Sequence, residues 1–315
     1  MQPRDPLSAI LSLIEARGVY TGGITAGGKW AFRIPPPAQI KLMVIARGQC
    51  FIAVEGEKRP RLLAEGDVFL NIARRPYTIA TDLSLRPRDF ERLYANAPKC
   101  EILAVGGGEE IMLIGSHIEL NEIGMRLLKN GLPPIVHLRA GDAGAGQIQW
   151  LIREMMRETG DAMPGAETAC SGMVELVFLH LLRAHIAKPG SVKIGWLRAA
   201  CDAKLAPALG LMHGDPARDW HLPELAKAAA MSRTAFATHF KSVAGVAPLA
   251  YLTEWRMRVA ERQLRESAKP VARIARSVGY TSEAAFSTAF KRVTGHSPRR
   301  RRAAAKIEAR ILEGV

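Results

Sequence analysis

The sequence predicts an α+β protein, in which an N-terminal antiparallel β-barrel with flanking helices precedes a C-terminal all-α domain with two helix-turn-helix motifs. Three observations support this prediction. Residues 22–115 form short β-type segments separated by Gly and Pro, which is typical of a barrel or a sandwich. After residue 120 the apolar residues recur with a helical period. Near the C-terminus, a segment of 27 residues, Leu222–Pro248, recurs about 50 residues further along the chain.

Length and charge predict two parts with different partners. At roughly 100–200 residues per domain, we expect a barrel domain at 1–140, a helical dimerisation or linker segment at 141–190 and a helical domain at 191–315. Residues 1–190 carry 22 basic and 20 acidic side chains, whereas residues 191–315 carry 22 basic and 10 acidic ones. The basic half therefore indicates a module that meets a polyanion. DNA is the leading candidate, because counterion release rewards clustered Lys and Arg, and a solvated basic surface is the alternative.

The sequence disfavours several other classes of protein. The N-terminus lacks the basic and apolar segments of a secretory signal, and no apolar run approaches the roughly 20 residues of a membrane span. The four cysteines are widely spaced and form no CxxC pair, which disfavours a zinc finger or a disulfide scaffold and fits a reducing cytoplasm. We find no arrangement of Ser, His and Asp for nucleophilic catalysis, and therefore expect no enzymatic activity and no cofactor.

The N-terminal half begins with a predicted helix at Asp5–Arg17. Asp5 can cap it, and Pro6 suits its first position. Short alternating segments follow as candidate strands. They are Trp30–Ile34, Ile40–Arg47, Gln49–Glu55, Arg61–Leu63, Val68–Ile72, Tyr77–Thr81, Glu101–Val105 and Ile111–Ile114.

Two amphipathic helices are predicted at Gln147–Glu158 and Thr168–Ala187. They could pack as an antiparallel pair that covers the barrel, or they could form a dimer interface. Lys188-Pro189-Gly190-Ser191 then has the composition of a linker.

The repeat in the basic half spans Leu222–Pro248 and Val271–Pro298. Most of it aligns at an offset of 50, whereas the upstream part aligns at 49, so the second copy has one extra residue in the turn, where Gly279-Tyr280 lies. The residues that recur are Ser232, Phe236, Phe240, Lys241, Val243, Gly245 and Pro248, matched by Ser282, Phe286, Phe290, Lys291, Val293, Gly295 and Pro298.

Each copy has the pattern of a helix-turn-helix. A short helix and a tight turn precede a serine that can cap a second helix, and two phenylalanines four residues apart form the core face of that helix. The polar or small residues of the other face can approach base edges in a major groove. We therefore predict that DNA contacts come from Ser232, Arg233, Thr234, Ala237, Thr238 and Lys241 in the first copy, and from Ser282, Glu283, Ala284, Ser287, Thr288, Lys291 and Arg292 in the second.

A helix at Pro248–Ser267 connects the copies, and its apolar stripe includes Trp255, which we interpret as a core residue. This helix would hold the two motifs rigidly. Their recognition helices could then enter successive major-groove faces about one helical turn, or ~34 Å, apart.

The segments LAKAAAMSRTAFATHFKSVAGVAPLAYLTEWRM and IARSVGYTSEAAFSTAFKRVTGHSP resemble the DNA-binding domain of AraC/XylS-type transcriptional regulators, over the last hundred residues. The resemblance implies sequence-specific promoter binding and contact with RNA polymerase. We expect an activator, and a repressor stays the alternative, since the sequence does not give the sign of regulation. That family commonly has an aromatic residue and an Arg shortly after the final Ser-Pro. Here Ser297-Pro298 is followed by four arginines, Arg299–Arg302, for which we expect phosphate contacts, with a solvated run as the alternative.

The β-rich half, including ARGQC and EGDVF, resembles the cupin-type sensor domain of some AraC-type regulators over roughly residues 5–140. Many cupins bind a metal through His residues on paired strands. This chain has no His within Lys41–Val44, and it has Tyr77 where a later His is usual. His117 and His137 lie outside that pattern, so we predict no metal site.

What the barrel senses stays open at this point. An organic effector would contact Leu42 and Val44, if they face inward, with Tyr77 at the edge of the cavity. Thiol chemistry at Cys50 and Cys100 is a second reading. The barrel could also be a dimerisation scaffold only. An anionic ligand is a further reading, with a solvated surface as the usual alternative, for the scattered cations Arg33, Lys41, Arg47, Arg74 and Arg75.

The combined prediction is a cytoplasmic, homodimeric transcription regulator. Its barrel would sense a small-molecule effector or a redox signal, and it would control a two-motif domain that binds double-stranded DNA and RNA polymerase but no membrane. The alternative is an architectural DNA-binding protein without a sensed ligand.

Overall fold

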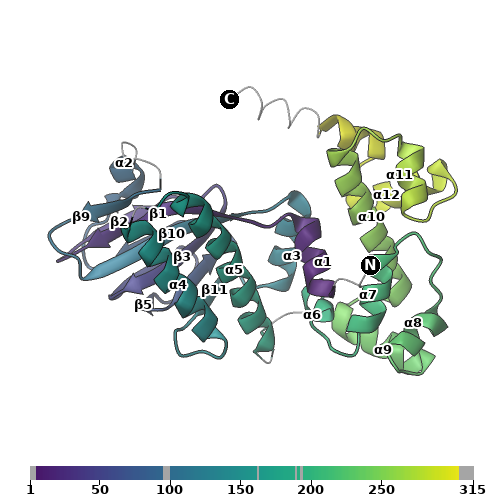
Figure 1. Cartoon of the computed structure of the whole chain (residues 1–315), viewed down its shortest axis with the longest axis horizontal. Coiled ribbons are helices and arrows are strands. Elements are labelled where there is room, and N and C mark those ends of the chain that lie inside the picture. Colours follow the sequence, from purple (N-terminus) through teal and green to yellow (C-terminus); the bar gives the residue numbers. More distant parts are fainter. Residues whose placement is uncertain (1–4, 95–99, 162, 189, 192–193, 305–315) are drawn as a thin grey trace. The chain divides into compact units, whose positions relative to one another are not determined.

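The computed structural model describes residues 5–94, 100–161, 163–188, 190–191 and 194–304 (Figure 1). Contacts divide the chain into a barrel unit, residues 15–193, and a helical unit, residues 1–14 together with 194–315. The second division lies close to the predicted linker. The first differs from the predicted domain 1–140, because helix α1 (Pro6–Ile14) packs against helices of the C-terminal half and buries Ile10 and Leu13 there.

The barrel unit consists of two sheets. A six-stranded sheet has the order β11-β6-β3-β10-β1-β9, and a five-stranded sheet has the order β5-β4-β7-β2-β8. The predicted barrel is confirmed, but the sheets are mixed, because β9 pairs with β1 and β8 pairs with β2 in parallel. The strands are β1 (Arg17–Ala26), β2 (Ala31–Ile34), β3 (Ile40–Arg47), β4 (Gln49–Val54), β5 (Arg61–Ala64), β6 (Val68–Asn71), β7 (Tyr77–Ala80), β8 (Arg88–Asp89), β9 (Ile102–Val105), β10 (Ile111–Glu119) and β11 (Ile135–Leu138).

Some boundaries differ from the prediction. Helix α1 ends at Ile14, since Glu15 adopts a left-handed conformation (φ 51°), and β1 begins at Arg17 within the range predicted as helix. Strand β11 lies in a region predicted to be helical, where it pairs with β6. The short helices α2 (Phe90–Tyr94) and α3 (Glu122–Gly131) also belong to this unit, and Asn121 caps α3 by accepting a hydrogen bond from the Gly124 amide at 2.9 Å.

Helices α4 (Ala145–Gly160) and α5 (Ala166–Ala187) pack against each other and cover the six-stranded sheet. Helix α5 lies along β1, where the Tyr20 amide donates to the Ser171 hydroxyl at 3.2 Å. A Cβ at Gly18 would lie 2.6 Å from the Glu175 amide nitrogen, so only glycine allows this close approach. By length and composition α5 is apolar enough to cross a membrane, contrary to our reading of the sequence, but its buried side chains pack within this unit.

The helical unit is all-α, as predicted. Helix α10 (Pro248–Glu266) contacts α9 of the first motif and α11 and α12 of the second, and α8 packs against α9 (Figure 1). Trp255 is 3% exposed, which confirms it as a core residue. The remaining helices are α6 (Trp196–Ala200), α7 (Ala206–Gly214), α8 (Leu222–Ala228), α9 (Arg233–Ala244), α11 (Val271–Ser277) and α12 (Glu283–Thr294), followed by a helical stretch at 298–304.

Candidate DNA-binding interface

The two motifs begin and end their second helices in the same way. The Ser232 hydroxyl accepts a hydrogen bond from the Ala235 amide, and the Ser282 hydroxyl accepts one from the Ala285 amide, both at 3.3 Å. At the other end, Gly245 and Gly295 adopt left-handed conformations, φ 80° and 81°, that end α9 and α12. Each serine therefore has a structural role as a helix N-cap, and its side chain remains exposed beside the recognition helix.

The turns show where the repeats diverge. The Met231 amide donates to the Ala226 carbonyl, and the Tyr280 amide donates to the Ala275 carbonyl, both at 2.9 Å, so the offset is still 49 there. The serine caps are offset by 50. The extra residue is therefore Thr281, one position later than the Gly279-Tyr280 pair that we predicted to hold it.

Matching aromatic cores anchor the two recognition helices. Phe236 and Phe240 lie with ring centroids 5.6 Å apart, and Phe286 and Phe290 lie 5.5 Å apart. All four rings are fully buried, the second pair against Met257 and Leu264 of α10. This packing leaves the opposite faces of α9 and α12 free. At ~1.5 Å per residue, the 19 residues of α10 span about 28 Å, close to one turn of B-DNA.

The structure describes every predicted DNA-contact residue. Ala237 and Ser287 are half-buried, and the others are exposed. Within the described part of the chain, Arg233, Lys241, Lys291 and Arg292 have no carboxylate within 4 Å, whereas several arginines of α10 are ion-paired, as Arg262 is with Glu266 at 3.1 Å. These four cations of the recognition helices can therefore exchange water for a phosphate.

The two central threonines differ. The Thr288 hydroxyl donates to the Ala284 carbonyl of its own helix at 3.0 Å. Thr238 makes no such bond among the described residues, so its hydroxyl can both donate and accept. The second helix also begins with Glu283 where the first has Arg233, which reverses the charge of the first turn.

The arginine run is not a uniform phosphate-binding surface. Arg301 is only 7% exposed at its side chain and lies 3.2 Å from the Glu261 carboxylate, which Arg258 also contacts at 3.2 Å. Arg302 donates to the Lys269 carbonyl. Our expectation for these two positions is wrong, because both side chains bind within the helical unit. Arg299 and Arg300 are exposed, and for them phosphate contact remains a prediction.

In the barrel, Leu42 and Val44 do not face the interior. The core between the sheets contains Met43 and Ile45 instead, and alternate residues of a strand point to opposite faces. Leu42 and Val44 are buried on the other face of β3, toward the side that α4 covers, so the premise of our effector prediction is wrong for them. Tyr77 does belong to the interior, and burial raises the pKa of its hydroxyl.

Lys41 is a half-buried cation, one of those named above for an anionic ligand. It lies on the Met43 face of β3, opposite His117 of β10. Its ammonium donates a long hydrogen bond of 3.4 Å to the Thr21 hydroxyl, and no described carboxylate lies within 4 Å. Burial lowers the pKa of Lys41 to about 8. Burial of His117, together with the nearby positive charge of Lys41, also lowers the pKa of His117.

The two cysteines predicted as candidates for thiol chemistry, Cys50 and Cys100, lie in different environments. Cys50 is buried in the core, and burial raises its pKa to about 12, which disfavours a reactive thiolate. The Cys100 thiol donates to the Tyr20 carbonyl at 3.5 Å. Burial raises the pKa of the Cys170 thiol of α5 to about 11, with smaller contributions from Glu158 and Cys100.

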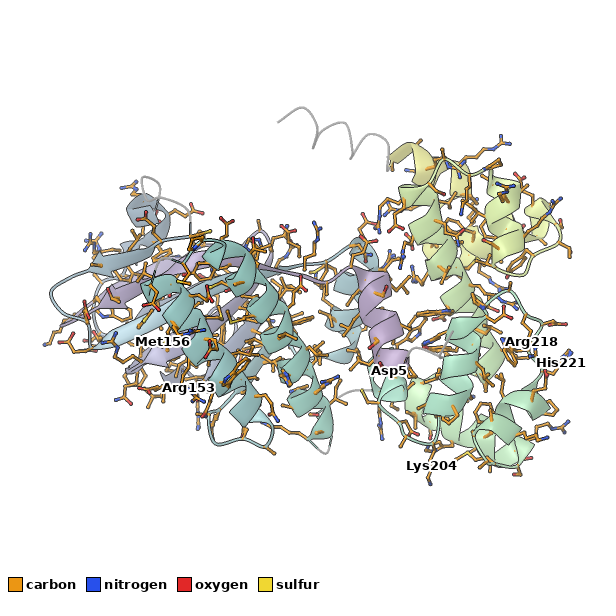
Figure 2. The ribbon with its side chains drawn as sticks, viewed as in Figure 1. Asp5, Arg153, Met156, Lys204, Arg218 and His221 are labelled. Atoms are coloured by element: carbon orange, nitrogen blue, oxygen red, sulfur yellow. The ribbon has the colours of Figure 1, made fainter. Side chains whose placement is uncertain are left out.

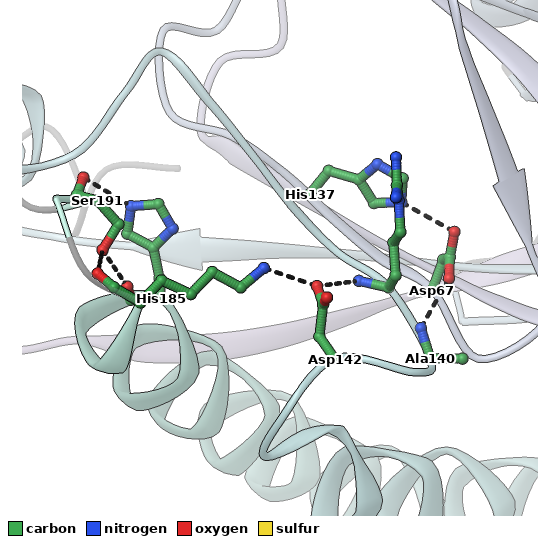
Figure 3. Close-up of polar contacts among 8 residues, drawn as sticks. Asp67, His137, Ala140, Asp142, His185 and Ser191 are labelled. Carbon is green, nitrogen blue, oxygen red and sulfur yellow. Dashed lines mark hydrogen bonds and ion pairs between the residues drawn. The ribbon is translucent and has the colours of Figure 1, made fainter.

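A polar network connects the last turn of α5 to the sheet (Figure 3). Asp67 accepts hydrogen bonds from His137 at 2.8 Å and from the Ala140 amide at 2.9 Å. Asp142 accepts from Lys188 at 2.7 Å, and this bond holds the pKa of Asp142 below its usual value. The network fixes the point where the chain leaves the barrel unit. His137 is thus held by the Asp67 carboxylate. Among the described residues, no group of three His, Cys, Asp or Glu side chains could hold a metal ion.

Comparisons with known proteins agree with this architecture. Residues 5–187 match a cupin family model, and residues 225–304 match a helix-turn-helix domain model. The chain is 38% identical over 294 residues to a putative AraC-like transcription regulator of Streptomyces antibioticus, covering 93% of this chain and 97% of that protein. It is 37% identical to a protein of the same description from Streptomyces lividans, covering 93% and 96%. It is 29% identical to the HTH-type transcriptional regulator AlkR of Acinetobacter baylyi, covering 94% and 98%.

The cupin barrel, the duplicated motif with its unpaired cations and the full-length similarity lead to one assignment. The chain belongs to the AraC-like, DNA-binding transcription regulators that carry an N-terminal cupin domain.

Proposed function

We propose that this regulator is a cytoplasmic, one-component transcription activator, in which an effector bound by the barrel changes how the two recognition helices engage a promoter and RNA polymerase. The observation that carries the proposal is that α9 and α12 are capped in the same way and both expose cations without an ion-pair partner among the described residues. The same chain also contains a cupin barrel. Phosphate contacts then supply salt-dependent affinity, and Thr238 and its neighbours supply sequence choice.

The interior of the barrel supports an effector with an apolar body and an acidic group. Aromatic and aliphatic side chains, among them Phe69 and Tyr77, fill the core, and Lys41 adds a positive charge on the same face of β3. A carboxylate beside Lys41 would replace the water that its ammonium has lost. The redox alternative now rests on the half-buried Cys100 rather than on the buried Cys50.

Exposed apolar residues on the covering helices support a homodimer. Trp150 of α4 is 55% exposed, and Leu176 of α5 is 45% exposed. A second copy would remove these side chains from water. The variants Trp150→Glu and Leu176→Glu should be monomeric in sedimentation, whereas Lys29→Glu, at an exposed position outside these two helices, should keep the oligomeric state of the parent.

The decisive experiment is selection of bound sequences from a random duplex library at near-physiological salt, using the full chain. We expect an enriched motif with two half-sites about one helical turn apart. Salt-sensitive binding without any enriched motif would instead indicate the architectural alternative.

The effector is tested separately, by the thermal unfolding of the full chain with a series of organic carboxylates and their amides. We expect carboxylates to raise the midpoint of the parent, and to raise that of Lys41→Met much less. A matched variant, Lys29→Met, removes an exposed lysine of the same unit and should respond as the parent does.

A further inference from the structure

A cavity of about 670 Å³ lies within the helical unit, apart from the barrel and from the recognition helices. Helix α1 contributes one wall with Ala9 and Leu13, and α10 contributes another with Trp255 and Val259. His213 of α7 completes these walls, and Arg218 marks the rim (Figure 2). The volume is within the range of about 300–1,000 Å³ that small-molecule sites in proteins have.

Among the described residues, no group forms a hydrogen bond with two buried ring nitrogens in these walls, Nδ1 of His213 and Nε1 of Trp255. The two rings stack at a centroid distance of 3.7 Å. The other ring nitrogen of His213 lies 2.9 Å from the Tyr251 hydroxyl. If that hydroxyl donates, its proton has an acceptor and His213 carries its own proton on Nδ1. Both orphan groups are then N–H donors.

A buried donor without a hydrogen-bond partner destabilises the folded protein, and a ligand oxygen that accepts its hydrogen bond would remove this penalty. The carboxylates beside the cavity do not supply that acceptor, because they already pair with arginines. The same pairs leave those arginines less able to hold an anionic ligand. Arg218 lies 2.6 Å from Glu224 and also stacks on Trp220, and Arg262 lies 3.1 Å from Glu266. What the cavity lacks is therefore an uncharged acceptor on a body that fits between aromatic walls.

We propose that this cavity binds a planar, uncharged aromatic molecule that carries a carbonyl oxygen. The ring system packs against Trp220, Trp255 and Val259, and a small rotation of the His213 ring opens the orphan donors to the carbonyl. Because α1 forms one wall, the bound molecule contacts both α1 and α10 and stabilises the packing of the N-terminal helix on the DNA-binding half. The site goes beyond the proposed function, since it does not involve the barrel.

The test uses the full chain and two naphthalenes of the same shape. One is 2-acetylnaphthalene, and the other is 2-isopropenylnaphthalene, in which a methylene group replaces the carbonyl oxygen. We expect saturable binding of the ketone in a ligand-observed NMR titration. The alkene should bind about fivefold more weakly, which is the share of affinity that one hydrogen bond typically supplies.

Two variants fill the cavity from opposite walls, Ala9→Trp from α1 and Val259→Phe from α10, and each should weaken ketone binding by about tenfold or more. Ser8→Trp adds the same ring at an exposed position of α1 and should bind as the parent does. Circular dichroism identifies any variant that does not fold. The proposal is overturned if the ketone shows no saturable binding, if the two naphthalenes bind equally, or if both folded cavity variants bind as the parent does. None of these outcomes bears on the proposed function, which is tested separately by promoter selection.

Discussion

The two helix-turn-helix motifs share one backbone plan and differ in how each is held to the rest of the helical unit. At the offset of 50, Tyr251 and Arg301 are equivalent, and each donates its amide to the carbonyl four residues earlier, Ala247 at 2.9 Å and Ser297 at 3.0 Å. Both side chains are buried. The first motif therefore uses an aromatic side chain at this position, and the second uses a cation.

The partners differ accordingly. The Tyr251 hydroxyl meets His213 at 2.9 Å, within a cluster of rings that includes Trp196 and Trp255. Arg301 meets Glu261, which is 4% exposed. A buried ion pair is demanding, because either charge alone would remain without compensation. The duplication thus preserved a helix position while the chemistry behind it changed, and the two motifs should fail under different perturbations.

Removing Glu261 should produce the largest effect. The variant Glu261→Ala leaves Arg301 buried without its carboxylate, and the loss should be about 3–5 kcal/mol of unfolding free energy. Tyr251→Phe in the first motif removes only one hydrogen bond and should cost about 1 kcal/mol. Urea unfolding of both variants measures the difference. Equal losses would mean that the two anchors are energetically alike.

Acid should weaken the first motif selectively. Burial lowers the pKa of His213 to about 3, against an ordinary value of 6.5. Since the folded-state pKa is depressed, the neutral ring is compatible with folding above pH 6.5. As the pH falls from 6.5 toward 3, the unfolded chain binds a proton that the folded chain refuses, and stability decreases by up to about 1.4 kcal/mol per pH unit.

At the position equivalent to Tyr251, the second motif has Arg301, which is paired with Glu261. Hydrogen exchange at pH 7 and pH 4.5 should therefore show greater loss of protection in α7 and α9 than in α12. The variant His213→Gln should remove most of that asymmetry. Uniform loss of protection along the helical unit would contradict the assignment of the acid response to His213.

The turns of the two motifs should respond to substitution with smaller changes in stability, and with opposite signs. Gly279 adopts φ 85°, and a Cβ there would lie 2.5 Å from the Ala217 carbonyl oxygen, so Gly279→Ala should cost about 1–3 kcal/mol. Ala230, its equivalent in the first motif, already adopts φ 53° with a side chain. Ala230→Gly should relieve that strain and change stability by less than about 1 kcal/mol, in the stabilising direction. Thermal unfolding of the two variants gives both signs.

The repeat was predictable in detail because its residues carry their structural roles locally. Serine caps, glycine helix ends and phenylalanines four residues apart need no distant partner to be read, and all of them lie where the sequence placed them. The extra residue was misplaced by one position, since only backbone hydrogen bonds distinguish Thr281 from its neighbours.

Features that depend on distant partners could not be read in this way. Both faces of β3 are apolar, so alternation did not reveal that Met43 rather than Leu42 faces the core. Arg301 lies in a run of arginines that resembles a solvated surface until Glu261 is placed beside it. Helix α1 was assigned to the barrel by its position in the chain, although its buried side chains contact the C-terminal half.

The recognition helices provide the finest comparison. Removing Lys241 or Lys291 should weaken binding to all duplexes alike and lower the slope of log affinity against log salt by about 1 for each lost phosphate contact. Thr238→Ala should instead change base preference with little change in that slope. Because the Thr288 hydroxyl already donates to the Ala284 carbonyl, Thr288→Ala should change preference less than Thr238→Ala does. Library selection at two salt concentrations separates these effects. If both threonine variants retain the parental motif, base readout must come from other residues of α9 and α12, with Arg233 and Glu283 as the next pair to exchange.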